Sequence, residues 1–210
     1  MKVIEPSIEL LTPFNGGDVL KFLESCGRVC YRSEKNITAD SSTNFIRNII
    51  KRGHESILEH FSCTFKIICD RGVMAELTRH RLASFSIEST RYCDYSSDKF
   101  GGDLTFIRPC FWKENDSNFI IWENRLRLIE SGYKNLRDNG CPPEQARAIL
   151  PNSLATTIII TTNLREWRHL LKLRTENKAH PQMRQIANMI LDTFKNLIPV
   201  VFEDIENGRI

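Results

Sequence analysis

The sequence predicts an α+β fold in which a mixed or antiparallel β-sheet is flanked by long helices. Three observations predict it: the strand-like segments are few, long helical segments separate them, and the chain lacks the regular β-α-β alternation of a doubly wound sheet. The chain has 210 residues, 41% of them hydrophobic, which is enough to bury a core. No repeat or low-complexity linker divides the chain. We therefore expect a single domain over residues 1–210.

Helices are expected wherever apolar residues recur at intervals of three and four. This spacing predicts helices over residues 17–31, 40–51 and 116–138, with a shorter helical stretch over 73–78. Gly140 and Pro142 are stop signals for the third of these helices. Asn163 is a suitable N-cap for a helix that runs to about Arg174. A last helix begins near Pro181 and should be kinked or interrupted at Pro199.

Strands are expected over residues 61–69 and 154–162, which are short and rich in β-branched and aromatic residues. The charge balance of 29 Lys and Arg against 26 Asp and Glu is too small to require a polyanionic partner, so no nucleic acid is expected. No apolar run reaches the roughly 18 residues of a membrane span, and the N-terminus has no signal-peptide pattern. We expect a cytoplasmic protein that does not engage a membrane.

The seven cysteines are odd in number, scattered, and without a C-x-x-C pair. This pattern argues against a disulfide framework and against a zinc site, so no metal is expected. The chain also lacks G-x-G-x-x-G and G-x-x-x-x-G-K-[ST]. A bound nucleotide would therefore have its phosphates held by side chains, arginines above all.

The most informative segment runs from Arg79 to Tyr92 and combines three arginines, a histidine and four hydroxyl residues within fourteen positions. Arginine forks and hydroxyl groups are what a desolvated phosphate needs, so the segment favours an anion site. Composition leaves the alternative open that it is a solvated basic helix end followed by a polar loop.

Two further constellations stand out. "GHESILEH" over residues 53–60 carries two histidines and two carboxylates before a predicted strand. Because it lacks the H-E-x-x-H spacing of a metal site, we interpret it as a helix-to-strand connection with a catalytic or structural histidine. On the helix that follows Asn163, Arg165 and His169 share one side. Arg174 lies beside leucines and can point into an apolar-walled cleft, where it needs an anionic or carbonyl partner.

These blocks, taken in order, resemble the flavin-dependent thymidylate synthases. The signature is R-H-R at residues 79–81, seven further residues, and Ser89. "GHESILEH" at 53–60, "EQARAILP" at 144–151, "NLREW" at 163–167, "LKLR" ending at Arg174 and "AHPQMR" at 179–184 also match family blocks. A lone R-H-R is weak, whereas ordered blocks over roughly residues 53–194 are highly specific.

The resemblance implies a reaction in which dUMP becomes dTMP. Methylenetetrahydrofolate donates the one-carbon unit, NADPH reduces FAD, and the reduced flavin supplies the hydride. The family needs no cysteine nucleophile, which suits a chain whose Cys26, Cys30, Cys63 and Cys69 lie in apolar stretches, where a thiol's pKa is expected to rise. The resemblance further implies a homotetramer in which subunits share their active sites.

The resemblance also implies roles for particular residues. Flavin contacts are expected from Ser56, Arg79, His80, Arg81, Asn163, Arg165 and His169. Contacts to dUMP are expected from Glu76, Arg79, Glu88, Ser89, Thr90, Arg91, Arg147 and Arg174. Arg174 would polarise the uracil edge as C5 becomes nucleophilic, and His54 would lie near the flavin ring and the folate; these two are the expected catalytic residues.

Two positions leave alternatives open. Many relatives carry Glu or Gln two residues before the motif serine, where this chain has Ile87, so either Glu88 or the backbone makes that contact, or the substrate is another pyrimidine nucleotide. His54 has a purely structural alternative as a helix-capping residue. The arginine cluster, with Phe85, Tyr92 and Trp167 for stacking, also fits a nucleotide- or nucleic-acid-binding module without turnover.

Overall fold

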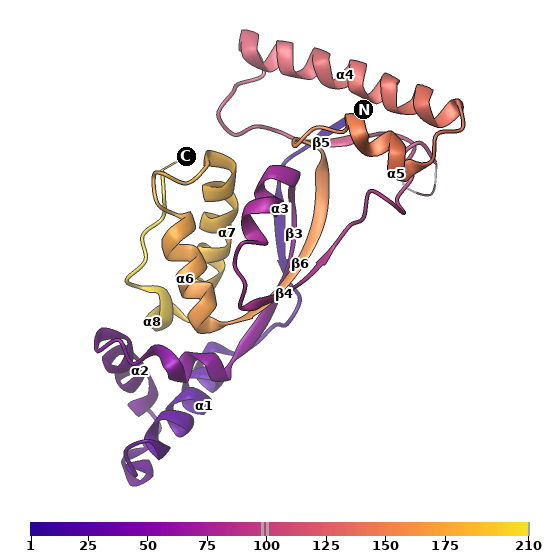
Figure 1. Ribbon diagram of the computed structural model, residues 1–210. Coiled ribbons are helices and arrows are strands. Elements are labelled where there is room, and N and C mark those ends of the chain that lie inside the picture. The colour runs from indigo at the N-terminus through magenta and orange to yellow at the C-terminus, as the bar shows by residue number, and fades with distance from the viewer. Residues whose placement is uncertain (98, 100, 210) are drawn as a thin grey trace.

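A four-stranded antiparallel sheet with the strand order β2-β3-β6-β4 forms the centre of the protein (Figure 1). The computed structural model describes residues 1–97, 99 and 101–209. The sheet consists of β2 (Ser7–Leu10), β3 (Ser62–Asp70), β4 (Ala83–Ile87) and β6 (Ala155–Asn163). A second, two-stranded parallel sheet pairs β1 (Lys2–Ile4) with β5 (Thr105–Ile107). The α+β prediction is confirmed.

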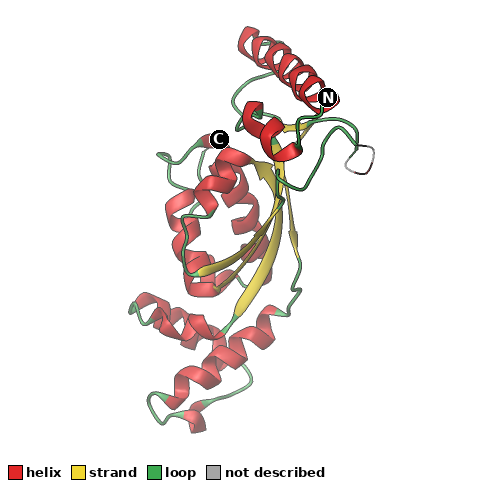
Figure 2. Ribbon diagram, turned by 45° about the vertical axis from the view of Figure 1, so that its right-hand side comes forward, coloured by secondary structure: helices red, strands yellow, loops and turns green. Residues whose placement is uncertain are grey.

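The helices are distributed unevenly around the sheet. They are α1 (Gly16–Val29), α2 (Ser41–Lys51), α3 (Arg71–Leu77), α4 (Ser117–Asp138), α5 (Pro143–Ala146), α6 (Leu164–Arg174), α7 (Pro181–Leu197) and α8 (Pro199–Phe202), with 3-10 turns η1 (Glu34–Asn36), η2 (Glu55–His60) and η4 (Arg147–Ile149). Helices α3, α6 and α7 lie on one face of the four-stranded sheet, α1 and α2 lie beyond one end, and α4 and α5 lie beyond the other (Figures 1 and 2).

The longer elements agree with the sequence prediction to within two residues. Asn163 caps α6 as expected, because its Oδ1 accepts a hydrogen bond of 2.9 Å from the Glu166 amide. Pro199 interrupts the last helix, since α7 ends at Leu197 and α8 begins at Pro199. Strands β1, β2, β4 and β5 were not predicted from the sequence, because strands of three to five residues are too short to show a clear alternation of polar and apolar residues.

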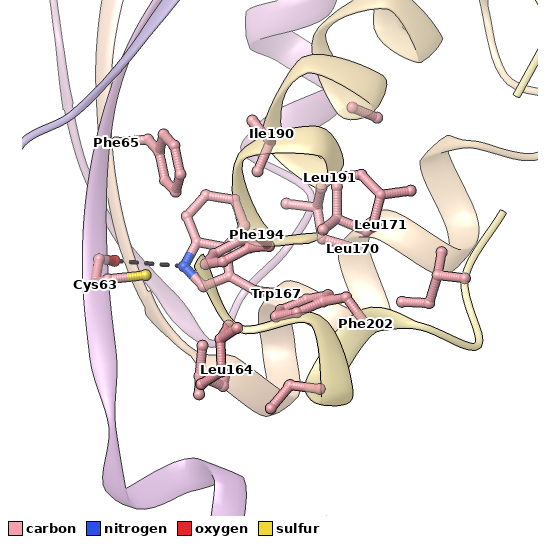
Figure 3. Packing of buried hydrophobic residues seen from close by; sticks show 14 of the residues in the cluster. Cys63, Phe65, Leu164, Trp167, Leu170, Leu171, Ile190, Leu191, Phe194 and Phe202 are labelled. Carbon is pink, nitrogen blue, oxygen red and sulfur yellow. Dashed lines mark hydrogen bonds between the residues drawn. The ribbon is translucent and has the colours of Figure 1, made fainter. Parts of the chain in front are cut away.

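The main core lies between the sheet and the helices that cover it. Alternate residues of β6 are buried, as a strand with one covered face requires. Trp167 of α6 is fully buried, packs edge-on against Phe65 of β3 with ring centroids 5.2 Å apart, and donates through Nε1 to the Cys63 carbonyl at 3.4 Å (Figure 3). Stacking of Phe194 on Phe202, with centroids 4.3 Å apart, joins α7 to α8. The contacts of Trp167 with Phe65 and Cys63 fix α6 against β3.

A second, smaller core surrounds α4. Its buried members are Tyr95, Leu104, Phe106, Leu126, Tyr133, Ala146 and Leu154. Tyr95 belongs to the segment that follows the R-H-R motif, so this cluster holds the far end of the motif region against α4 and α5.

Arg168 carries a buried charge that joins three parts of the chain. Only 1% of its side chain is exposed. Its guanidinium donates to both carboxylate oxygens of Asp204 at 2.7 and 2.8 Å, to Glu55 at 3.1 Å, and to the Val201 carbonyl. A buried guanidinium needs such partners to offset its lost hydration. The cluster therefore ties α6 to η2 and to the segment after α8.

We expect the Asp204 carboxylate to make stability depend on pH. Burial raises the pKa of this carboxyl, but hydrogen bonds and charges from Arg168 and Lys172 outweigh burial and lower it to about 2. Because the folded pKa lies below the unfolded value of about 3.9, the contribution is complete above about pH 5 and is lost as the pH falls toward about 2. Urea unfolding of the wild type and Asp204→Asn across this range measures it. A stability difference between the two proteins that is the same at pH 3 and pH 7 would contradict the assignment.

Candidate functional site

The strand registers bring three of the sequence blocks to one end of the sheet. Ser62, which follows "GHESILEH", pairs with Asn163 at the end of β6. On the other side of β6, Ala83 pairs with Thr162, so the R-H-R motif that precedes β4 lies at the same end. Helix α6 begins there with the "NLREW" block. Segments about 100 residues apart in the chain thus meet beside the start of α6.

Arg174 is held by three acceptors at the end of α6. Its NH1 donates to Glu76 Oε2 at 2.8 Å, its NH2 to the Glu76 carbonyl at 3.1 Å, and its Nε to His80 Nε2 at 3.1 Å. Its side chain is 16% exposed. The expectation that a half-buried arginine here needs an anionic or carbonyl partner is confirmed, and Glu76 supplies both.

His80 is the buried member of the R-H-R motif. Its side chain is 3% exposed, and its Nδ1 lies 3.2 Å from Glu166 Oε1. His169 Nδ1 lies 3.2 Å from the same oxygen. Burial lowers the pKa of His80 and the Arg174 charge lowers it further, against the opposing effect of Glu166. His80 is therefore a neutral imidazole near pH 7.

The predicted flavin residues of α6 border a pocket of about 610 Å³. The pocket is lined by Glu55, Glu59, Leu82, Asn163, Arg165, Glu166, Arg168, His169 and Lys172. Arg165 donates to Glu59 at 2.5 Å, and both side chains are about half exposed. Arg79 and Arg81 are exposed next to this region. Within the described part of the chain neither has an ion-pair partner, so both are available to an anionic ligand.

The "GHESILEH" block forms η2, which leads into β3. His54 precedes η2, is exposed, and has its Nδ1 3.1 Å from the Tyr31 hydroxyl. His54 is the N-cap residue of η2, but its side chain makes no capping hydrogen bond. Ser56 is exposed, and its neighbour Glu55 accepts from Arg168. The buried ion pair therefore holds the backbone that presents His54 and Ser56.

Five of the predicted nucleotide residues, namely Glu88, Ser89, Thr90, Arg91 and Arg147, lie toward the other end of β4, whereas Glu76, Arg79 and Arg174 do not. Thr90 is buried and its Oγ1 accepts from Arg147 NH1 at 3.2 Å, while Ser89 Oγ accepts from the Arg91 amide at 3.3 Å. The Arg91 guanidinium lies over the Tyr92 ring, 5.6 Å from its centroid. This region holds two exposed arginines, Arg91 and Arg147, and fits a second anion site. The polar-loop alternative for the whole segment is wrong, because β4 crosses it.

Glu88, the residue beside the unexpected isoleucine, is held by its own neighbours. Its carboxylate accepts from the Tyr95 hydroxyl at 2.6 Å, and its carbonyl accepts from Arg71 at 3.2 Å. Ile87 is 36% exposed at the end of β4, opposite Ile158. Ile87 itself offers no polar side chain to a ligand.

Two residues that contact the predicted site residues, Glu166 and Arg168, were not predicted from the sequence. Glu166 contacts both histidines, although an acidic residue three positions after an N-cap is normally read as part of a capping box. Arg168 appeared as one of several basic residues, but its side chain is buried. The helical spacing was the available signal: Glu166 and His169 lie three residues apart, and Arg168 falls on the apolar side with Trp167 and Leu171.

The buried cysteines are poor nucleophiles. Burial raises the pKa of the Cys63 thiol to about 12 and also raises the pKa of Cys69, as the sequence predicted. Burial is likewise the main cause that raises the pKa of Cys93, the cysteine nearest the motif. A thiol with a raised pKa carries little thiolate at neutral pH.

One group of side chains has the spacing of metal ligands. His80, Glu166 and His169 offer atoms that all lie within 4.8 Å of one another. His80 Nε2, however, accepts from the guanidinium of Arg174, and a cation would be repelled by that charge at short range. The expectation that the protein holds no metal therefore stays a prediction.

The fold and these clusters define an α+β protein with exposed arginines at both ends of one strand. The family model described as "Thymidylate synthase complementing protein" matches residues 16–200. The chain belongs to the flavin-dependent thymidylate synthase family, and it is an enzyme of the methyltransferase class. None of the helices in the described residues has both the length and the apolar character needed to cross a membrane.

Individual relatives support the family. A probable flavin-dependent thymidylate synthase of Mycobacterium phage L5 is 34% identical over 207 residues, covering 91% of this chain and 83% of the relative. The flavin-dependent thymidylate synthase of Geobacter sulfurreducens is 34% identical over 188 residues, covering 86% and 79%. A crystal structure of a UMP/dUMP methylase from Streptomyces cacaoi bound with 5-Br dUMP matches with a TM-score of 0.79 and 24% identity over 97% of this chain and 96% of that one.

Proposed function

We propose that this enzyme carries out the reductive methylation of dUMP to dTMP, with methylenetetrahydrofolate as one-carbon donor and NADPH-reduced FAD as hydride source. The observation that carries the proposal is the half-buried Arg174, held beside the R-H-R motif by Glu76 and His80. Family membership supports the same reaction, and the solved structure that is similar in fold binds a dUMP analogue. Residues 1–210 would act as one domain.

The residues around the start of α6 fit a flavin. The pocket of about 610 Å³ lies within the usual size of ligand sites, about 300–1,000 Å³. Its rim offers Asn163, Arg165 and His169, and exposed Arg79 and Arg81 lie next to it. Ser56 and His80 complete the proposed set. When bound there, FAD would supply the hydride, and the arginines would stabilise the negative charge of its reduced form.

The opposite end of β4 is the proposed phosphate site. Arg91 and Arg147 would pair with the dUMP phosphate, and Ser89 and Thr90 would complete its hydrogen bonds. Glu88 would contribute through the orientation that Tyr95 imposes on its carboxylate.

The base and sugar of dUMP would lie against Arg174 and Glu76. The guanidinium of Arg174 would polarise the uracil edge and increase electron density at C5, the carbon that attacks the one-carbon donor. Glu76 would hold Arg174 and accept from the ribose hydroxyl, Arg79 would contact both flavin and nucleotide, and His54 would lie near the folate. No cysteine takes part, which the raised thiol pKa of Cys63 and Cys93 supports.

A complete site would combine residues from different subunits of a homotetramer. The five residues of β4 span roughly 17 Å at about 3.4 Å per residue. Within one chain, this strand separates the Arg174 cluster from Arg91 and Arg147. A second copy can bring its own arginines next to Arg174. Seven unpaired cysteines suit an enzyme of the reducing cytoplasm.

The reaction is tested by a product assay with each component omitted in turn. The purified protein should be yellow from bound flavin, and it should form dTMP from dUMP only when FAD, NADPH and methylenetetrahydrofolate are all present. UMP is run beside dUMP, because Ile87 stands where relatives carry a polar residue. A colourless protein that forms no methylated product would contradict the proposal.

Arg174 should act in the chemical step. Arg174→Lys and Arg174→Ala should both slow single-turnover dTMP formation about a hundredfold, the usual effect of losing one fixed donor in a transition state. Lysine should not rescue the rate, because a point charge on a flexible stem cannot reproduce the planar donor geometry of a guanidinium. Bound flavin and its reduction by NADPH should persist. Arg127→Lys, at an exposed position of α4, is the matched control. Equal rates in all four proteins would remove Arg174 from catalysis.

Shared sites should show as complementation between inactive variants. Co-expressed Arg174→Ala and Arg91→Ala chains should regain activity, because a mixed oligomer contains sites in which both arginines are intact. Arg174→Ala with Glu76→Ala should not recover, since these residues contact each other within one chain. Light scattering measures the assembly. An active monomer, or a lack of recovery in the first pair, would overturn the shared site.

A further inference from the structure

A buried chain of polar side chains connects Glu166 to Arg174 through His80. Glu166 is 8% exposed and His80 3% exposed. One imidazole nitrogen of His80 faces Glu166 Oε1 at 3.2 Å and the other faces Arg174 Nε at 3.1 Å. The imidazole thus lies between a carboxylate and a guanidinium, with almost no access to water.

The position of the imidazole proton follows from the donors on either side. The guanidinium of Arg174 has only N–H donors and stays charged. His80 Nε2 must therefore be the unprotonated nitrogen, because it accepts from Arg174. A neutral imidazole carries its one proton on the other nitrogen, so Nδ1–H donates to Glu166. Protonation of both nitrogens would set two N–H groups against each other at Arg174.

Glu166 is well placed to accept the hydrogen bond from His80 Nδ1–H. Its backbone amide donates to the Asn163 cap at 2.9 Å, which fixes the residue in the first turn of α6. A carboxylate there is stabilised by the positive end of the helix dipole. His169 Nδ1 lies within 3.3 Å of both carboxylate oxygens and steadies the side chain from the solvent side.

We infer that Glu166 is a positioning residue, which keeps the His80 proton on Nδ1 and thereby fixes the direction of the Arg174 guanidinium. Without the carboxylate, only the Arg174 donor opposes the other tautomer of the buried neutral His80, and Arg174 can relieve that contact by turning. The Nε2–H of His80 would then face the Nε–H of Arg174, and the guanidinium would have to turn away from Glu76. The inference rests on the proposed function for its kinetic consequence, but the tautomer itself does not.

The tautomer is measured directly on the whole protein by ¹⁵N NMR of labelled histidine. The chain has five histidines, and the His80 signals are assigned by their loss in His80→Asn. In the wild type at neutral pH, His80 should show a protonated Nδ1 and an unprotonated Nε2. Glu166→Gln keeps an acceptor oxygen and should preserve this pattern, whereas Glu166→Ala should mix or reverse the tautomers. Glu123→Gln, on α4, is the charge control and should match the wild type.

Kinetics then test the consequence for Arg174. Per bound flavin, the rate of single-turnover dTMP formation should fall about a hundredfold in Glu166→Ala, which is the usual loss when a catalytic group is displaced by about 1 Å. In Glu166→Gln the rate should stay within about tenfold of the wild type. Flavin reduction by NADPH should change little in either. A loss that merely reflects poor folding would lower flavin occupancy and both rates together.

The outcomes separate the inference from the proposed reaction. A wild-type His80 protonated at Nε2, or an unchanged tautomer in Glu166→Ala, would overturn the inference whatever the activity. Wild-type turnover per flavin in Glu166→Ala would overturn its kinetic part. If the wild type forms no dTMP but shows the expected tautomer that Glu166→Ala loses, the reaction is wrong and the positioning role of Glu166 stands.

Discussion

The antiparallel pairing of β3 with β6 is the constraint on which the rest of the structure depends. Its register runs from Ser62 opposite Asn163 to Asp70 opposite Ala155. The first pair places η2 beside the start of α6, and the last leads from Asp70 directly into α3. A shift of one residue would turn each buried side chain of β6 toward the open face and would separate the blocks at both ends. The core around Trp167 and Phe65 fixes this register because those side chains fit only one face.

Two arginines of α6 show how the protein uses buried charge in different ways. Arg168 is enclosed by Glu55, Asp204 and a backbone carbonyl, and it joins three segments. Arg174 donates to Glu76 and to His80, whose other ring nitrogen lies 3.2 Å from Glu166 Oε1. The Arg168 side chain is 1% exposed, whereas that of Arg174 remains 16% exposed. A charge that is oriented in advance and still reachable is what electrostatic catalysis requires.

The exposed arginines lie at opposite ends of one strand, which is the physical reason for the proposed assembly. Arg79 and Arg81 precede β4 and Arg91 follows it, so one extended strand keeps them apart. Helices α3, α6 and α7 cover one face of the sheet (Figure 2), and β4 is an edge strand in the order β2-β3-β6-β4. Neither end of β4 carries all three of these arginines. Opposite ends of β4 from two copies of the chain can bring such arginines together without any change in the fold.

Local patterns in the sequence were enough for the long elements and for the family. Helical spacing, the Asn163 cap and the Pro199 break depend on neighbouring residues, and they appear where expected. The ordered blocks around the R-H-R motif identified the chemistry for the same reason. Short strands such as β4 remained hidden, because their stability comes from pairing with β6 and not from their own residues.

Only the tertiary structure decided which polar groups are buried together. Glu76 and His80 come from the end of α3 and the turn after it, whereas Glu166 and Arg174 lie on α6, and no spacing in the chain indicates that these two segments meet. Hydrogen bonding between distant residues depends on strand register and helix packing, which are set by the whole core. The sequence by itself thus determined the types of the long elements and the residues of the motif. The protonation, orientation and partners of those residues were decided by the contacts between α3, β4 and α6, because burial and hydrogen bonding act only once the chain has folded.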